Sequence, residues 1–173
     1  EDTCAVRTNG RLACWGYNAD GQVSGPNGSM DAYIAVSTGD YHTCALRTDG
    51  RLACWGDDVV GQVSGPNEST GVYTAVSTGE YHTCALRSDG RLACWVVDVV
   101  GQVSGPNQST GVHTAVSSGE YHTCALRSDG RLACWGFEGS GAVAGPNADA
   151  GFYGLGQLDC DDENPCTADL CDP

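Results

Sequence analysis

The cysteines are the residues of this chain with the clearest capacity for chemistry. There are eleven of them in 173 residues, well above the usage of a cytosolic protein. Eight form four pairs with the same nine-residue gap: Cys4/Cys14, Cys44/Cys54, Cys84/Cys94 and Cys124/Cys134. Zinc sites favour a shorter Cys-x2-Cys spacing and usually include histidine. We therefore interpret the pairs as disulfides of a protein from an oxidising compartment.

Histidines recur at one fixed position as His42, His82 and His122. A ring of metal ligands is one interpretation. The first copy of the pattern has Asp2 at this position, however, and the nearby cysteines are already used in pairs. We therefore expect structural histidines that are satisfied by hydrogen bonds to backbone groups.

No arrangement typical of an enzyme is visible in the sequence. It contains no nucleophile elbow, no HExxH zinc motif and no phosphate-binding glycine loop. Catalysis normally requires one asymmetric constellation of groups, and nearly identical repeats do not provide one. We predict that the protein is not an enzyme and that it needs no cofactor, with calcium as the single candidate ion.

The calcium candidate lies near the C-terminus, where the oxygen-bearing residues Asp159, Asp161 and Glu163 alternate along the chain. Such alternation can ligate calcium, although the spacing and the missing glycine do not match an EF-hand. The sequence also contains three N-x-S sequons, which make glycosylation a candidate modification. The alternative is that these asparagines only form a Pro-Asn turn. The acceptors are Asn27, Asn67 and Asn107.

One tryptophan recurs in each repeat, as Trp15, Trp55, Trp95 and Trp135. These rings could form a platform for sugars, or they could pack between neighbouring repeats. Their fixed place in the repeat favours packing.

Charge narrows the classes of partner. Twenty-two acidic residues against eight basic ones give a formal net charge of −14, which argues against nucleic acid. An acidic surface suits an extracellular protein or one that binds cations, and it also fits a solvated surface with no specific partner. We find no signal peptide and no apolar run long enough to cross a membrane. We expect no membrane insertion, and we interpret the chain as a processed or excised segment of a secreted or cell-surface protein.

The elements that position the cysteines are four copies of one β-hairpin, which in the second copy reads YHTCALRTDGRLACWG. The copies span residues 1–16, 41–56, 81–95 and 121–136. Gly50 supplies the left-handed residue of a three-residue loop. This loop pairs Leu46 with Leu52 and Cys44 with Cys54, so that the two sulfur atoms face each other across the hairpin.

The 40-residue period continues between the hairpins. In the second copy we expect a variable loop at residues 56–60, a short strand at 61–64, a turn-rich loop at 65–71 and a third strand at 72–77. About four strands per 40 residues is the size of a propeller blade. We therefore predict an all-β fold of four propeller-type blades, each with a disulfide-bonded hairpin. The blades are residues 1–40, 41–80, 81–120 and 121–157, and a Cys/Asp-rich tail follows at 158–173.

The run AVSTGDYHTCALRTDGRLACWG at residues 35–56 resembles the repeat of the regulator of chromosome condensation superfamily. In its 40-residue spacing it is similar to the bacterial beta-lactamase inhibitory propeller proteins. The resemblance implies β-propeller blades. Those families use seven blades, whereas this chain carries four repeats. Chromatin and nucleotide-exchange roles do not carry over, because this composition is acidic and rich in disulfides.

The ends and the loops indicate how such blades could meet a partner. Residues 152–156, which include Phe152 and Tyr153, are in register with the third strand and could complete the first blade of this molecule or of a neighbour. The tail adds an odd set of cysteines: Cys160, Cys166 and Cys171. The loops after the tryptophans contain valines that form either an exposed contact surface or a layer under the following strand. These valines are Val59, Val60, Val96, Val97, Val99 and Val100.

From these observations we expect a non-catalytic extracellular protein that assembles with copies of itself, because near-identical blades reuse one interface. The alternative is a secreted, inhibitor-like module that binds another extracellular protein with its variable loops. A carbohydrate-binding propeller with one shallow site per blade is the third hypothesis.

Overall fold

The computed structural model describes residues 2–96, 98–138 and 141–153. Each of the first three repeats contributes a two-stranded hairpin, a five-residue helix and a strand that joins the next hairpin, and the described part of the fourth contributes a hairpin and a helix. The elements in chain order are β1 (Asp2–Val6), β2 (Leu12–Gly16), α1 (Ser24–Gly28), β3 (Tyr33–Thr38), β4 (His42–Arg47), β5 (Leu52–Gly56), α2 (Ser64–Glu68), β6 (Tyr73–Thr78), β7 (His82–Arg87), β8 (Leu92–Val96), α3 (Ser104–Gln108), β9 (His113–Ser118), β10 (His122–Arg127), β11 (Leu132–Gly136) and α4 (Ala144–Ala148). No helix in this part of the chain is both long enough and apolar enough to span a bilayer.

The hairpins fold as the sequence predicts. Gly50 has φ of 80°, and its backbone N–H donates to the carbonyl of Arg47 at 3.0 Å, which closes the turn. Cys44 lies opposite Cys54 in the ladder, and the two sulfur atoms are bonded. The other three hairpins contain the corresponding disulfides, Cys4–Cys14, Cys84–Cys94 and Cys124–Cys134. The prediction of disulfide-bonded hairpin repeats is confirmed.

The segment after each hairpin differs from the prediction. Residues 61–63 form a turn that leads into α2, which begins at Ser64, and no strand is present there. The first three repeats therefore each have three strands and one short helix. Oδ1 of Asp58 accepts hydrogen bonds from the backbone N–H groups of Val63 and Ser64, both at 2.9 Å. Pro66 is tolerated because the first turn of a helix needs no backbone N–H donor. A helix of five residues leaves no periodic pattern in the sequence, which explains the error.

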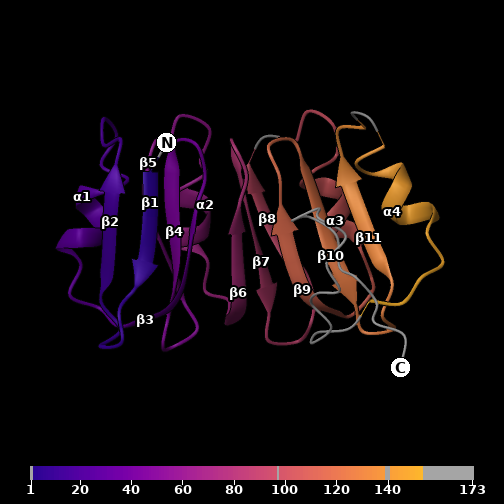
Figure 1. Cartoon of the computed structure of the whole chain (residues 1–173), viewed down its shortest axis with the longest axis horizontal. Coiled ribbons are helices and arrows are strands. Elements are labelled where there is room, and N and C mark those ends of the chain that lie inside the picture. Colours follow the sequence, from indigo (N-terminus) through magenta and orange to yellow (C-terminus); the bar gives the residue numbers. More distant parts are fainter. Residues whose placement is uncertain (1, 97, 139–140, 154–173) are drawn as a thin grey trace, which may run out of the picture.

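The strands form four antiparallel sheets, one for each hairpin. Three sheets have three strands, in the orders β3-β4-β5, β6-β7-β8 and β9-β10-β11, and the first sheet has only β1 and β2. Figure 1 shows the sheets side by side in chain order. Contacts between β3 and β6, and between β6 and β9, bring the third strands of neighbouring sheets together.

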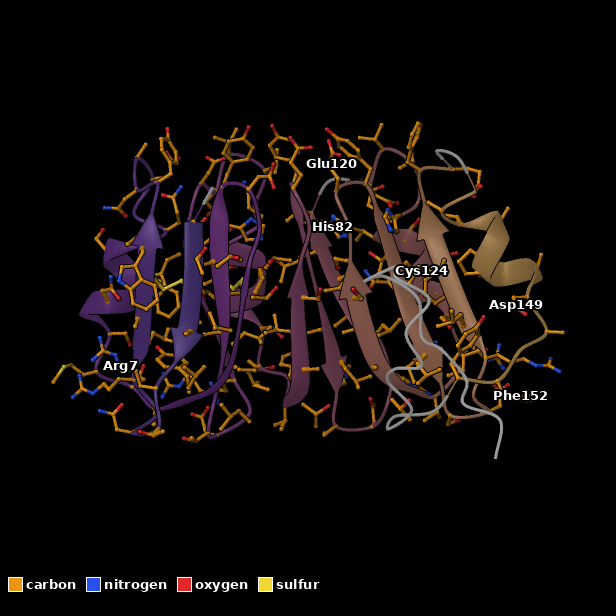
Figure 2. All side chains as sticks on the ribbon, in the orientation of Figure 1. Arg7, His82, Glu120, Cys124, Asp149 and Phe152 are labelled. Atoms are coloured by element: carbon orange, nitrogen blue, oxygen red, sulfur yellow. A yellow bond between two sulfur atoms is a disulfide. The ribbon has the colours of Figure 1, made fainter. Side chains whose placement is uncertain are left out.

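The described residues form an open row of blades. Figure 2 places Arg7 and Phe152 at opposite ends of this row. The backbone N–H of Tyr153 donates to the carbonyl of Gly130 at 2.6 Å, within the fourth repeat. Phe152 and Tyr153 therefore do not pair with β1 of their own molecule, as one version of the strand prediction required. The rest of that predicted strand lies outside the described residues.

The hydrophobic core is divided into clusters between neighbouring sheets. In one of them, Leu46 and Leu52 of the second repeat contact Tyr73 and Ala85, which belong to the third sheet. The same arrangement recurs between the first and second sheets and between the third and fourth. Each blade is therefore stabilised mainly by its neighbours, as in other repeat proteins.

Candidate functional site

Buried polar side chains connect neighbouring repeats. Nε2 of His42 lies 2.9 Å from Oγ1 of Thr83 in the next repeat, and His82 has the same contact with Thr123 at 2.9 Å. Thr83 donates its hydroxyl proton to the carbonyl of Gln62 at 3.1 Å. It must therefore accept the proton of His42 Nε2–H, which makes His42 the neutral Nε2–H tautomer. Nδ1 of His42 is then a buried acceptor with no partner among the described residues.

These histidines are structural, as expected, although their partners are threonine hydroxyls and not backbone groups. Burial lowers the pKa of His42 and of His82 to about 4, with a smaller contribution from the neighbouring histidine in each case. Asp2 replaces histidine in the first repeat and accepts a hydrogen bond from Oγ1 of Thr43 at 3.0 Å. In the described part of the chain, no three histidine, cysteine or acidic side chains are grouped so as to hold a metal ion.

In the second, third and fourth repeats, the tryptophan packs on the helix of the repeat before it. A Cβ atom added at Gly105 would lie 2.4 Å from Cδ1 of Trp135. The corresponding distances are 2.5 Å from Gly25 to Trp55 and 2.9 Å from Gly65 to Trp95. These three half-buried rings are part of the joints, our name for the contacts between neighbouring repeats. Packing between repeats, which the sequence favoured, is confirmed for these three tryptophans, and carbohydrate binding stays a prediction. Trp15 is 58% exposed, and no described atom lies within 4 Å of a Cβ added at Gly145.

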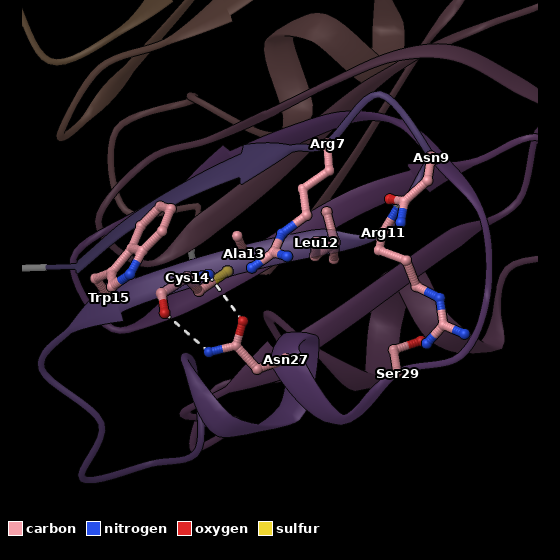
Figure 3. A pocket seen from close by; sticks show the side chains of 9 residues that line it. All are labelled: Arg7, Asn9, Arg11, Leu12, Ala13, Cys14, Trp15, Asn27 and Ser29. Carbon is pink, nitrogen blue, oxygen red and sulfur yellow. Dashed lines mark hydrogen bonds between the residues drawn. The ribbon is translucent and has the colours of Figure 1, made fainter.

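A hollow of about 480 Å³ lies beside Trp15 (Figure 3). Asn27 lines it, and its side chain makes two hydrogen bonds with the backbone of Cys14, both at 2.8 Å. Asn147 makes the same two bonds with Cys134, although it is not part of a sequon. This asparagine therefore has a structural role in every repeat, and glycosylation at the three sequons stays a prediction. The lining residues are Arg7, Asn9, Arg11, Leu12, Ala13, Cys14, Trp15, Asn27 and Ser29.

The loops that follow the tryptophans expose apolar side chains. The exposed fraction is 52% for Tyr17, 86% for Val59, 78% for Val99 and 54% for Phe137, one side chain in each repeat. Val60 and Val100 are also exposed. The hypothesis that these four valines lie under the following strand is therefore wrong. Val97 lies outside the described residues.

Val96 occupies a backbone conformation that glycine adopts in the other repeats. Its φ is 101°, and the corresponding Gly16, Gly56 and Gly136 have φ between 111° and 120°. A β-branched residue at positive φ is strained. Val96 ends β8 and is half-buried, so it is not part of the exposed surface that the sequence suggested.

Three tyrosines that the sequence analysis did not single out lie next to these loops. The rings of Tyr41 and Tyr81 are stacked with their centroids 5.4 Å apart. A hydrogen bond with Tyr41 raises the pKa of Tyr81 to about 12, and the Glu80 carboxylate raises the pKa of Tyr121. The three phenols are equivalents in the repeat, each preceded by an acidic residue. This recurring acidic-Tyr pair was the signal that could have identified them.

We call the exposed and partly exposed side chains of this region the loop edge. It consists of Tyr17, Tyr41, Val59, Val60, Tyr81, Val99, Val100, Tyr121 and Phe137. A hollow of about 440 Å³ opens in it between the third and fourth repeats. Figure 2 shows two of the residues that line this hollow, His82 and Glu120, near the upper edge of the sheets. The lining residues are Tyr81, His82, Val99, Val100, Gln102, Glu120, Tyr121 and Phe137.

The remaining sequence-predicted residues are not part of the loop edge. Phe152 is 63% exposed, and the guanidinium of Arg131 lies 5.6 Å from its ring centroid. Figure 2 shows Phe152 at the opposite edge from Glu120, so the predicted contact residues fall into two separate places. The calcium candidates Asp159, Asp161 and Glu163 and the three tail cysteines lie outside the described residues.

Comparisons with known proteins agree with this architecture. The model of the family described as regulator of chromosome condensation (RCC1) repeat matches residues 3–22, 33–62, 73–95 and 114–142. A search of curated protein sequences finds no match.

Several solved structures are similar to the chain. The entire ectodomain of the Physcomitrella patens receptor kinase CR4 is 25% identical, with a TM-score of 0.66 over 78% of this chain and 39% of that one. The CRINKLY WD40 ectodomain of the Arabidopsis thaliana receptor kinase ACR4 is 25% identical, with a TM-score of 0.63 over 79% of this chain and 50% of that one. Yeast RCC1 (Prp20) bound to Kap60 is 18% identical, with a TM-score of 0.64 over 79% and 42%. The chain spans half or less of the length of each.

Proposed function

Because the chain belongs to the regulator of chromosome condensation (RCC1) repeat family, with four matched repeats, we propose that it is a non-catalytic protein-interaction module. Its partner binds at the loop edge. The observation that carries this proposal is the presence of a mostly exposed apolar side chain in each of the four loops: Tyr17, Val59, Val99 and Phe137. Exposed apolar groups gathered along one edge mark interaction sites more often than isolated ones do.

The contrast within each repeat supports the same function. The joint residues recur with little change, whereas the loop residue after the strand is Tyr17 in one repeat, Asp57 in another and Phe137 in a third. An asymmetric partner therefore meets different chemistry at each blade. Aromatic side chains provide large contact areas at protein interfaces for little loss of conformational entropy.

The proposed place of action is extracellular. The four disulfides support this assignment, as does the likeness to two receptor-kinase ectodomains. For yeast RCC1, a protein of this fold is bound to another protein, Kap60.

An unbiased peptide selection on the immobilised chain tests the proposal. The selected peptides are then compared on a variant in which four exposed loop-edge residues are changed to serine. The substitutions are Tyr17→Ser, Val59→Ser, Val99→Ser and Phe137→Ser. We expect most peptides to lose binding to this variant, because it removes the apolar contact area while leaving the joints intact.

The matched control changes four exposed apolar residues away from the loop edge: Met30→Ser, Ile34→Ser, Val72→Ser and Val112→Ser. Peptide binding should survive these changes. The proposal is wrong if the control variant loses the selected peptides and the loop-edge variant keeps them.

A second candidate function is head-to-tail assembly of copies of this chain. The specific observation is that the two ends of the row are complementary. Trp15 is 58% exposed at one end, and Gly145 of α4 at the other end has no described atom within 4 Å of an added Cβ. Each internal joint seats a tryptophan on such a glycine. The Trp15 ring of one copy would fit on α4 of another in the same way.

Size-exclusion chromatography with light scattering tests this assembly at high protein concentration. We expect species larger than the monomer, which Trp15→Ala or Gly145→Leu shifts to the monomer. Trp15 and Gly145 make no internal joint, so these changes should leave the fold intact. A wild-type chain that is monomeric at every concentration would exclude the assembly.

A further inference from the structure

The hollow between the third and fourth repeats has apolar walls and an acidic side chain beside them. Valine and aromatic side chains form the walls, namely Val99, Val100, Tyr81, Tyr121 and Phe137. The exposed Glu120 carboxylate stands among them. Neither arginine nor lysine is among the lining residues. The walls present an apolar surface that suits the aliphatic part of a ligand, and the exposed carboxylate beside them disfavours an anion.

The histidine and the two tyrosines that line the hollow are uncharged at neutral pH. Nε2 of His82 lies 2.9 Å from Thr123 Oγ1, and Thr123 donates its proton to the carbonyl of Gln102 at 3.0 Å. His82 is therefore the donor in its own hydrogen bond and carries no charge at neutral pH, since burial lowers its pKa to about 4. Tyr81 and Tyr121 keep their protons as well, because their pKa values are raised.

The carboxylates near the hollow favour a positive ligand. Glu120 lines a second, shallower hollow together with Glu80 and Asp40, so the negative charge continues along the edge. Oε2 of Glu80 is buried without a hydrogen-bond partner among the described residues. The whole chain has a formal net charge of −14. Cations are also attracted to the faces of aromatic rings.

We propose that this hollow is an anchor pocket for a long cationic side chain, arginine or lysine, presented by a protein partner. The inference rests on the proposed function and names the chemistry of the partner at this point. The methylene stem of such a side chain packs on Val99, Val100 and Phe137, as amphipathic side chains do on apolar surface. Its charged end reaches the rings of Tyr81 and Tyr121 and the carboxylate of Glu120.

The experiment is an NMR titration with two short glycine peptides that differ in one side chain. One carries a central arginine, and the other carries citrulline, which has nearly the same shape without the charge. We expect the arginine peptide to shift the signals of Val99, Val100, Tyr121 and Phe137. Binding of the citrulline peptide should be about five- to tenfold weaker, the range that a cation–π and carboxylate contact provides.

Matched variants test whether the arginine peptide binds at this hollow. Glu120→Gln and Phe137→Ser should each weaken binding of the arginine peptide about fivefold or more, as expected for loss of a charge or of an aromatic wall. Asp40→Asn and Tyr17→Ser change the corresponding positions of other repeats and should have little effect. Because all four side chains are exposed or half-exposed, the fold should survive each change.

Two outcomes overturn the proposal. Equal binding of the arginine and citrulline peptides removes the role of charge. An equal effect of Asp40→Asn and Glu120→Gln reduces the interaction to general attraction by an acidic surface. If peptides selected on the chain bind the loop edge but arginine is not preferred over citrulline, only the anchor pocket fails. If the selected peptides bind elsewhere, the proposed function fails independently.

Discussion

The joints between repeats and the loop edge lie in the same blades, but the residues of the joints are the same in successive repeats, whereas those of the loop edge differ. At the joints, the Trp–Gly contact and the His–Thr hydrogen bond recur with the same geometry, for example 2.9 Å at both histidines. At the loop edge, equivalent positions hold Tyr17, Asp57 and Phe137. The difference shows that folding depends on the part of the repeat that is copied, while the part that varies is free for recognition.

The largest expected change in the free energy of unfolding comes from removing a tryptophan at a joint. Trp95→Ala should lower the free energy of unfolding by about 3–5 kcal/mol, since it leaves a cavity against α2. Trp15→Ala removes the same side chain from an exposed site and should cost less than about 1 kcal/mol. Urea unfolding measures both. Equal losses would show that the Trp–Gly contact does not hold the repeats together.

The dependence of stability on pH tests the histidine–threonine hydrogen bonds at the joints. His42 and His82 are neutral in the fold, and their pKa values of about 4 lie below the ordinary value of 6.5. Their contribution is complete above about pH 6.5 and is lost as the pH falls toward 4, because the unfolded chain then binds more protons. The loss is about 3 kcal/mol per histidine. Unfolding measured from pH 7 to pH 4 should show this slope.

The control for the acid experiment is the double variant His42→Gln, His82→Gln. It should be less stable than the wild type at pH 7 but should lose less stability than the wild type between pH 6.5 and pH 4. The remaining loss comes in part from His113, whose pKa burial also lowers. A wild-type chain with constant stability across that window would contradict buried neutral histidines.

Alanine substitutions at two glycines in equivalent helix positions should change the free energy of unfolding in opposite directions. Gly105→Ala places a methyl group 2.4 Å from Trp135 and should destabilise by about 1–3 kcal/mol. Gly145→Ala meets no described atom and should stabilise by about 0.5–1 kcal/mol through helix propensity. Thermal unfolding separates the two. A loss of stability at Gly145 would show that this surface of α4 is covered.

The smallest change concerns Val96, which lies where the joint and the loop meet. Val96→Gly should raise the free energy of unfolding by about 1 kcal/mol, because glycine adopts φ of 101° without strain. Gly56→Val, the reverse change one repeat earlier, should be destabilising, since its Cβ would lie 2.4 Å from the carbonyl of Tyr41. Both are measured by urea unfolding. A destabilising Val96→Gly would contradict the strain.

The same contrast explains what could be predicted from the sequence. The hairpin was predictable because Gly50 fixes the turn, and the turn fixes the partner of Cys44 by counting alone. The family resemblance was confirmed for the same reason, since repetition makes a pattern visible. The short helices were missed because the hydrogen bonds that start α2 come from Asp58, in a loop whose sequence varies between repeats.

The loop edge was predictable only in part. The valines stood out by their hydrophobicity, but whether Val59 is exposed depends on the path of its loop and not on its own pattern. The tyrosines were overlooked because Tyr41 and Tyr81 meet across two repeats, and residues 40 positions apart are brought together only by the stacking of blades. Recognition sites that form between repeats therefore require the three-dimensional arrangement.

The placement of the disulfides within hairpins, and not between blades, has a mechanical consequence. Each bridge joins cysteines only 10 residues apart, so within the described residues no disulfide prevents one blade from separating from the next. Pulled from its two ends, the chain should lengthen blade by blade, in steps of about 30 residues or roughly 100 Å. Reduction would add about 35 Å to each step. The molecule can thus extend under load while every hairpin keeps its own fold.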